Sequence, residues 1–114
     1  MAEKVYILDQ ITPKIGRAKD VAKVYMDTYV PGAMARGMTL ELSLIAPPMW
    51  LENQANVLYF LWSVEGVAGW WSSQMKSRVD DGVSDWWRDL EPLIESRRRD
   101  FPADLTDIAR LTNV

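Results

Sequence analysis

Two carboxylates and a tyrosine are the residues whose types could carry out proton transfer in this sequence. Asp9, Glu41 and Tyr59 each lie in a segment with strand character. A carboxylate in an apolar pocket has a raised pKa and can act as general base or acid, while a tyrosine hydroxyl can hold a developing oxyanion. We therefore predict that these three residues are catalytic. The alternative is that Glu41 faces solvent and Asp9 is an edge or hairpin charge.

Aromatic residues are the second candidate group, because six of the 114 residues are tryptophan. Neighbouring helical residues point about 100° apart, so each Trp-Trp pair can place one ring in the core and one elsewhere. The second ring could stack on a flat apolar ligand, with the indole N–H orienting a carbonyl or hydroxyl. For the second tryptophan ring, the alternative is a dimer contact. For the tyrosines, the alternative is plain core packing. The predicted substrate-binding residues are Tyr25, Tyr29, Trp50, Trp62, Trp70, Trp71, Trp86 and Trp87.

The absence of histidine and cysteine limits the chemistry most strongly. It removes the commonest general base, the usual haem ligand, thiolate nucleophiles and most zinc and copper sites. The sequence also has no glycine-rich phosphate loop, nucleophile elbow or metal-binding motif. We therefore expect no cofactor and no metal.

Charge and hydropathy give further expectations about partners and location. The net charge of −3 argues against nucleic acid and anionic membranes as partners. The basic cluster Arg97–Arg99 is interpreted as the solvated end of an element, or as a site for an anion or a carboxylate. Arg36 is interpreted as a surface residue, or as a partner for a substrate carboxylate. The first ten residues lack signal-peptide character and no run approaches about 20 apolar residues, so we expect a cytoplasmic protein.

These candidate residues must be positioned by one small α+β domain, residues 1–114, with a core at about 4–101 and a C-terminal arm at 102–114. The expected strands are 5–10, 39–45 (beginning near Met38), 57–64 and 95–101. Three helices are expected. The first begins at Thr12-Pro13 and ends near Tyr29, the second begins at Gly66, and the third runs from Ser84 to about Pro92.

The order β-α-β-β-α-(α)-β is the ferredoxin-like plan, with a four-stranded antiparallel sheet in the order 4-1-3-2. In that order the third strand separates the first two. Asp9 and Glu41 would then flank Tyr59, about 10 Å apart.

Four segments, VYILDQITPK, YVPGAMARGMTLE, FLWSVEGVAGWW and DWWRDLEPLIESRRRDF, resemble the dimeric α/β-barrel superfamily. Within it they are most similar to NIPSNAP-like and antibiotic-biosynthesis-monooxygenase-like proteins. The resemblance covers roughly residues 4–101. It implies a homodimer whose two sheets pair into a barrel, and a small hydrophobic molecule bound between the other sheet face and the helices. The lack of histidine departs from the branches that degrade haem or cyclise through a pocket histidine.

The sequence therefore predicts a cofactor-free enzyme acting by proton transfer, as an isomerase, lyase or cyclase, on an apolar aromatic, polycyclic or terpenoid-like substrate. The alternatives are a cofactor-free monooxygenase and a non-catalytic ligand- or partner-binding domain. A domain of this size leaves part of its sheet uncovered, which also favours a homodimer.

Overall fold

The protein is built on a four-stranded antiparallel sheet with the order β2-β3-β1-β4, which confirms the predicted order 4-1-3-2. The computed structural model describes residues 3–78 and 87–112. The strands are β1 (Lys4–Pro13), β2 (Thr39–Ala46), β3 (Val57–Glu65) and β4 (Ile94–Asp100). Their bounds lie within a residue or so of those expected, except at the end of β1.

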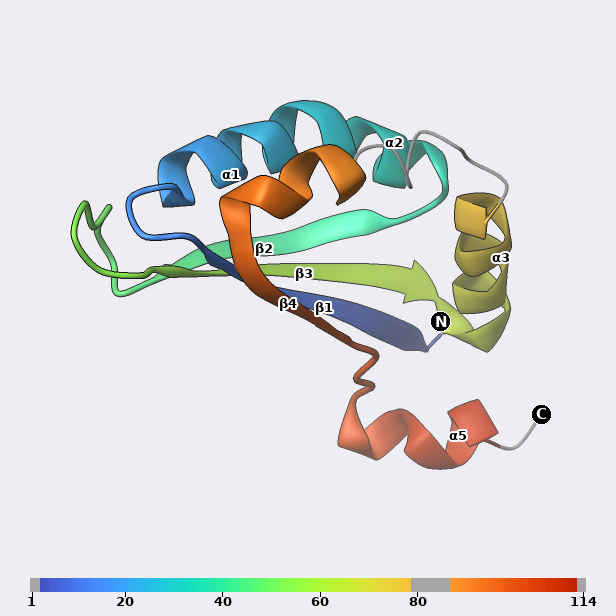
Figure 1. Cartoon of the computed structure of the whole chain (residues 1–114). Coiled ribbons are helices and arrows are strands. Elements are labelled where there is room, and N and C mark those ends of the chain that lie inside the picture. Colours follow the sequence, from blue (N-terminus) through green and yellow to red (C-terminus); the bar gives the residue numbers. More distant parts are fainter. Residues whose placement is uncertain (1–2, 79–86, 113–114) are drawn as a thin grey trace.

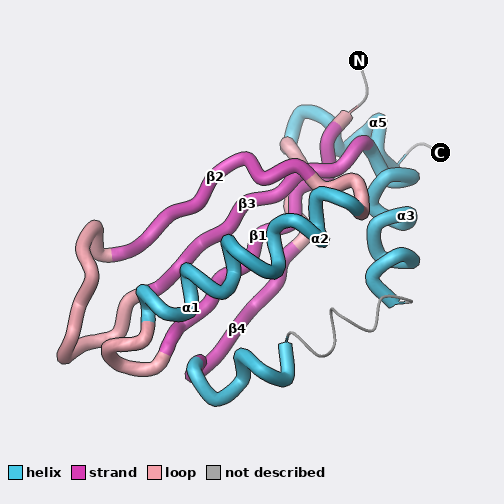
Figure 2. Tube along the Cα trace, turned by 90° about the horizontal axis from the view of Figure 1, so that it is seen from above, coloured by secondary structure: helices cyan, strands magenta, loops and turns pink. Residues whose placement is uncertain are grey.

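One face of the sheet is covered by a long helical segment (Figures 1 and 2). This segment consists of α1 (Ala18–Val24), a π-helical turn (Tyr25–Tyr29) and α2 (Val30–Ala35). A helical turn at residues 87–90 and the 3-10 turn Glu91–Leu93 precede β4 on the same side. We call this side the helix face.

The remaining helices lie at the margins of the sheet. Helix α3 (Gly66–Arg78) follows β3 directly, as expected. The C-terminal arm contains a 3-10 turn (Leu105–Asp107) and α5 (Ile108–Thr112), and Figure 1 shows α5 on the side of the sheet away from α1. The arm is attached to β1, because the backbone N–H of Tyr6 donates to the carbonyl of Pro102.

Strict alternation in the two central strands separates the sheet faces. In β1 every second residue from Val5 is buried, and in β3 the same holds for Leu58, Phe60, Trp62 and Val64. These side chains form the core with the helical segment. The opposite side, which we call the open face, carries half-buried residues of β1 and β3 and the exposed Leu42 and Leu44 of β2.

The predicted helix start at Thr12-Pro13 is wrong. Strand β1 continues through Pro13, which pairs with Ile94 beyond an irregularity in the ladder. A proline is tolerated there because the strand ends and needs no further N–H donor. The helix begins at Ala18, after Gly16 turns the chain with a φ of 76°.

The predicted helix end near Tyr29 is also wrong, because the helix continues to Ala35. The π turn widens the helix, with the N–H of Val30 bonding to the carbonyl of Tyr25. Pro31 consequently falls in the first turn of the next α-helical segment, where a missing N–H costs little. Gly37 follows this helix with a φ of 92°, a left-handed conformation that glycine adopts readily.

The described part of the chain, residues 3–78 and 87–112, has no helix long and apolar enough to cross a bilayer. The predicted helix start at Ser84 and the candidate residue Trp86 lie outside the described residues.

Candidate functional site

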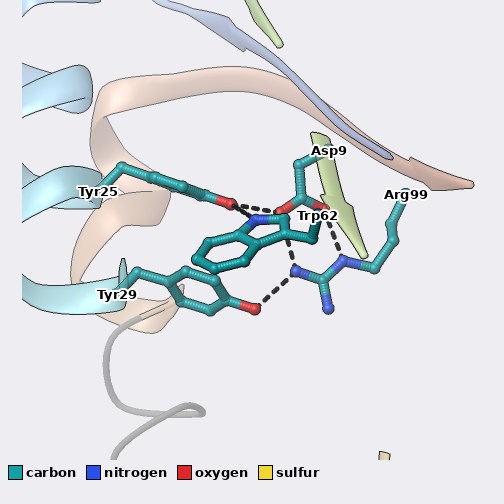
Figure 3. Close-up of polar contacts among 5 residues, drawn as sticks. All are labelled: Asp9, Tyr25, Tyr29, Trp62 and Arg99. Atoms are coloured by element: carbon teal, nitrogen blue, oxygen red, sulfur yellow. Dashed lines mark hydrogen bonds and ion pairs between the residues drawn. The ribbon is translucent and has the colours of Figure 1, made fainter. Parts of the chain in front are cut away.

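A buried polar network lies between the sheet and the π turn (Figure 3). It consists of Asp9, Tyr25, Tyr29, Trp62 and Arg99. Nε and Nη2 of Arg99 donate to the two carboxylate oxygens of Asp9 at 2.5 and 2.8 Å. The Tyr25 hydroxyl donates to Asp9 Oδ2 at 2.7 Å and accepts from Trp62 Nε1 at 2.7 Å. Arg99 Nη2 also donates to the Tyr29 hydroxyl at 2.7 Å.

Three local features of the chain bring these residues together. Asp9 occupies a helix-face position of β1, and the antiparallel register places Arg99 of β4 directly opposite it. Trp62 lies on the same face of β3, the strand on the other side of β1. The π turn begins at Tyr25 and ends at Tyr29, and it directs both phenol rings to the sheet, with centroids 4.9 Å apart.

The surroundings of Tyr25 and Arg99 keep each of them in one protonation state. Burial raises the pKa of Tyr25 well above the usual value, and the charge of Asp9 beside it adds to the effect. Burial alone would lower the pKa of Arg99, but the hydrogen bonds and charge of Asp9 outweigh it and raise that pKa. The tyrosine therefore stays neutral and the arginine stays charged at any physiological pH.

The network is closed on the side of Asp9, which is 2% exposed, and is most open at Arg99, whose side chain is 27% exposed. The Asp9 carboxylate already accepts three hydrogen bonds from within the network. This arrangement ties together β1, β3, β4 and the π turn, and the group closest to solvent is a cation that can hold an anionic oxygen.

The structure does not bring Asp9 together with Glu41 and Tyr59. Phe60 lies on the helix face, so strand alternation places Tyr59 on the open face. Glu41 accepts hydrogen bonds from Ser63 Oγ at 2.7 Å and from Lys4 Nζ at 3.1 Å. The predicted pocket flanked by two carboxylates is therefore absent, because the two carboxylates lie on opposite faces of the sheet.

An irregularity in β2 explains why Glu41 departs from the expected alternation. The register between β2 and β3 shifts between Leu40 and Leu42, as in a β-bulge. The hydrogen bond to Ser63 and the nearby Lys4 lower the pKa of Glu41. Glu41 is thus a partly exposed, ion-paired residue, as the alternative interpretation had it.

The described tryptophans do not line one pocket, although Trp62 and Trp87 both contact the ring of Tyr29. Trp62 belongs to the buried network, and Trp87 packs on Tyr29 with Arg97 above its ring. On α3, Trp70 is half-buried and contacts Phe101, while Trp71 is 52% exposed. The prediction that neighbouring tryptophans place one ring inward and one outward is confirmed for this pair.

Trp50 lines an apolar pocket of about 260 Å³ at the edge of the sheet, between α1 and strand β2. We call it the β2-edge pocket. The residues that line it are Ala22, Met26, Ser43, Leu44, Ile45, Trp50, Leu58 and Phe60. Phe60 connects the pocket to the network, because its ring stacks on Tyr25 with centroids 3.7 Å apart.

A buried asparagine holds the loop that carries Trp50. Asn56 Oδ1 accepts from the N–H of Leu51 at 3.0 Å, and its Nδ2 donates to the carbonyls of Met49 and Ala46 at 2.8 and 3.4 Å. Since Asn56 is almost fully buried, these bonds bind the loop to the start of β3.

A larger groove of about 740 Å³ lies beside β4 and is lined by charged residues of both signs. They include Lys14, Arg97, Glu91 and Glu95, together with Trp87. Its polarity does not suit the predicted apolar substrate. Within residues 3–78 and 87–112, no three carboxylates gather as a metal-binding group.

Arg99 and Arg36 are the residues that the sequence interpretation misplaced. The cluster Arg97–Arg99 does not point uniformly to solvent: Arg99 is buried against Asp9, whereas Arg98 pairs with Asp100. Arg36 is buried, with its guanidinium 5.6 Å from the centroid of the Tyr29 ring. The sequence carried one signal for the contact of Arg99 with Asp9. Asp9 is a carboxylate within the apolar strand β1, and the predicted sheet order places the basic strand β4 beside it.

Comparison with known proteins shows the fold of this chain. No protein-family model and no curated protein matches its sequence. A NIPSNAP family protein of unknown function from Agrobacterium tumefaciens strain C58 has a TM-score of 0.69 at 13% identity, with 91% of this chain and 92% of that chain covered. A NIPSNAP-like domain protein from Burkholderia xenovorans has a TM-score of 0.72 at 9% identity, over 93% and 89%.

A protein from Nitrosomonas europaea, provisionally assigned as an antibiotic biosynthesis monooxygenase, has a TM-score of 0.58 at 8% identity, over 92% and 93% of the chains. The predicted resemblance to NIPSNAP and monooxygenase-like proteins, and the ferredoxin-like fold, are therefore confirmed. At these identities the likeness concerns the fold, and function must be argued from the site.

The network makes a direct prediction for stability. Asp9→Asn should lower the free energy of unfolding by about 3 kcal/mol, because it leaves the partly buried Arg99 without its counter-charge. Glu41→Gln is the matched control and should have a much smaller effect, since its ion pair is exposed to water. Urea unfolding followed by circular dichroism measures both. Equal losses in the two variants would contradict the assigned role of Asp9.

The loop makes a second prediction. Asn56→Ala should destabilise the protein by about 2 kcal/mol, because backbone groups of Leu51 and Met49 lose their partners. Asn53→Ala, in the same loop but exposed, should be nearly neutral. Thermal unfolding compares the two variants, and an unchanged melting temperature for Asn56→Ala would show that the loop is held by other contacts.

Proposed function

We propose that this protein is a homodimeric binding domain for a small apolar molecule, which it holds in the β2-edge pocket. The observation that carries the proposal is the pocket itself. Its described lining is almost entirely aliphatic and aromatic and includes the half-exposed Trp50. An apolar concavity with a few polar groups is the usual form of a small-molecule site.

The location of the pocket agrees with the binding region that the resemblance implies. It lies between the helix face of the sheet and α1, at the level of Met26 and Phe60. Asp9 is not offered as a base in this proposal, since its carboxylate is bound by Arg99 and Tyr25. The network instead supports the wall of the pocket through the ring of Phe60.

The open face supports the proposed homodimer. Leu42 and Leu44 are 50% and 52% exposed there. They adjoin the half-buried Tyr59 and Leu61 of β3, with which they pair in the sheet. A second copy would remove these side chains from water, and this burial would stabilise the dimer by about 25 cal/mol per Å² of apolar surface. Leu44 also lines the pocket, so a partner on the open face would border the ligand site.

A cofactor-free enzyme is the second candidate function. A buried ion pair with two tyrosines is costly for a domain of this size, and such networks are frequent at catalytic sites. Two of the similar structures carry provisional assignments as antibiotic biosynthesis monooxygenases. In this case the partly exposed Arg99 would hold an oxyanion of the substrate, which fits either proton transfer or oxygenation. Product formation from a bound ligand with and without oxygen separates the two chemistries.

The binding proposal predicts the effect of filling the pocket. Ala22→Leu adds bulk to its lining and should weaken binding of flat phenolic or quinone compounds at least tenfold, whereas Ala35→Leu, on the exposed end of α2, should not. Titration followed by tryptophan fluorescence measures the affinities, and circular dichroism confirms that both variants fold. Equal affinity in both variants would place the ligand elsewhere.

The dimer proposal makes a separate prediction. The native protein should be a dimer by light scattering at micromolar concentration, and Leu42→Glu should be a monomer because it buries a charge in the proposed interface. Met34→Glu introduces the same charge on α2, among the helices of the other sheet face, and should remain a dimer. A monomeric native protein would contradict the paired-sheet arrangement.

A further inference from the structure

The β2-edge pocket selects its ligand by charge. None of the described residues that line it is ionisable. On the helical segment beside it, Lys23 and Asp27 form an ion pair with each other, with Lys23 Nζ 2.7 Å from Asp27 Oδ2. An anionic or cationic ligand would lose part of its hydration on entry without gaining a counter-charge from the lining, which weakens its binding. The pocket therefore favours a molecule without net charge.

Ser43 supplies a polar contact in this apolar lining. It lies on the helix face of β2, opposite Phe60 in the ladder. Its hydroxyl donates to Met26 Sδ at 4.0 Å. A thioether sulfur is a weak acceptor, so a hydroxyl or carbonyl oxygen of a ligand would be a better partner. Trp50 also lines the pocket, and its indole carries the other side-chain hydrogen-bond donor among the lining residues.

The size and walls of the pocket restrict the shape of the ligand. Its volume of about 260 Å³ lies just below the range of sites for drug-sized molecules. Trp50 and Phe60 are the aromatic residues of its lining, and aromatic rings pack well against other flat rings. Two or three fused rings suit this space better than the four rings of a steroid.

From these observations, and resting on the proposed binding function, we infer that the pocket takes a neutral fused-ring aromatic molecule of two or three rings, and that Ser43 hydrogen-bonds its hydroxyl or carbonyl group. Ser43 is then the residue that distinguishes an oxygenated ligand from the bare hydrocarbon. The network does not contact the ligand in this arrangement.

Three probes of matched shape test the inference on the full chain: 1-naphthol, naphthalene and 1-naphthoate. The native protein should bind 1-naphthol about fivefold more tightly than naphthalene, because one hydrogen bond contributes roughly that factor to affinity. It should bind 1-naphthoate more weakly than either. Ser43→Ala should bind 1-naphthol no better than naphthalene, with the affinity for naphthalene unchanged. Ser72→Ala, on the exposed side of α3, should behave as the native protein.

Each outcome of the isothermal titrations decides a different point. Binding of none of the three probes by the folded native protein contradicts the proposed binding function itself. Binding of 1-naphthoate as tight as that of 1-naphthol overturns the selection for neutral ligands. A fivefold preference that persists in Ser43→Ala overturns the role of Ser43 while leaving the pocket intact. The comparison of 1-naphthol with naphthalene in the native protein needs no variant.

Discussion

A carboxylate inside an apolar core needs a counter-charge, and in this protein that requirement links the two ends of the chain. Asp9 of β1 is bound by Arg99 of β4, 90 positions later. The pair fixes which strand lies beside β1 and in which register. The tyrosines of the π turn complete the hydrogen bonding, so the helical segment is positioned by the same two charges. An unpaired Asp9 would cost a large share of the small net stability of a domain this size.

This constraint separates structural from ligand-binding roles across the sheet. The network occupies the middle of the helix face, where strands β1, β3 and β4 meet the π turn. The β2-edge pocket lies beside it, and Phe60 belongs to both, stacking on Tyr25 and lining the pocket. The open face carries the leucines proposed for dimerisation. The proposed ligand site and the proposed dimer surface therefore lie on different sheet faces, and Leu44 at the edge of β2 adjoins both.

Much of the fold could be predicted from the sequence, because alternation and turn residues determine the strands. The burial of Tyr25 and Tyr29, and their need for partners, also followed from the helical spacing. The face of Glu41 could not be predicted, since a bulge in β2 shifts the alternation. The π turn, which displaces Pro31 to a tolerated position, gives no simple periodic signal. The aromatic residues were predicted to share one pocket, but composition cannot show that Trp50 and Trp71 lie apart from Trp62 and Trp87, which both contact Tyr29.

The central claim is that the ligand site is the β2-edge pocket, and that the Asp9–Arg99 network supports its wall without contacting the ligand. The most direct test is a crystal structure of the protein with bound 1-naphthol. The claim predicts density for the ring system between Trp50 and Phe60, with its oxygen within hydrogen-bonding distance of Ser43 Oγ and with Asp9 still bound to Arg99. Density against Arg99 and Tyr29 instead would contradict it and would favour the enzyme with an oxyanion at the arginine.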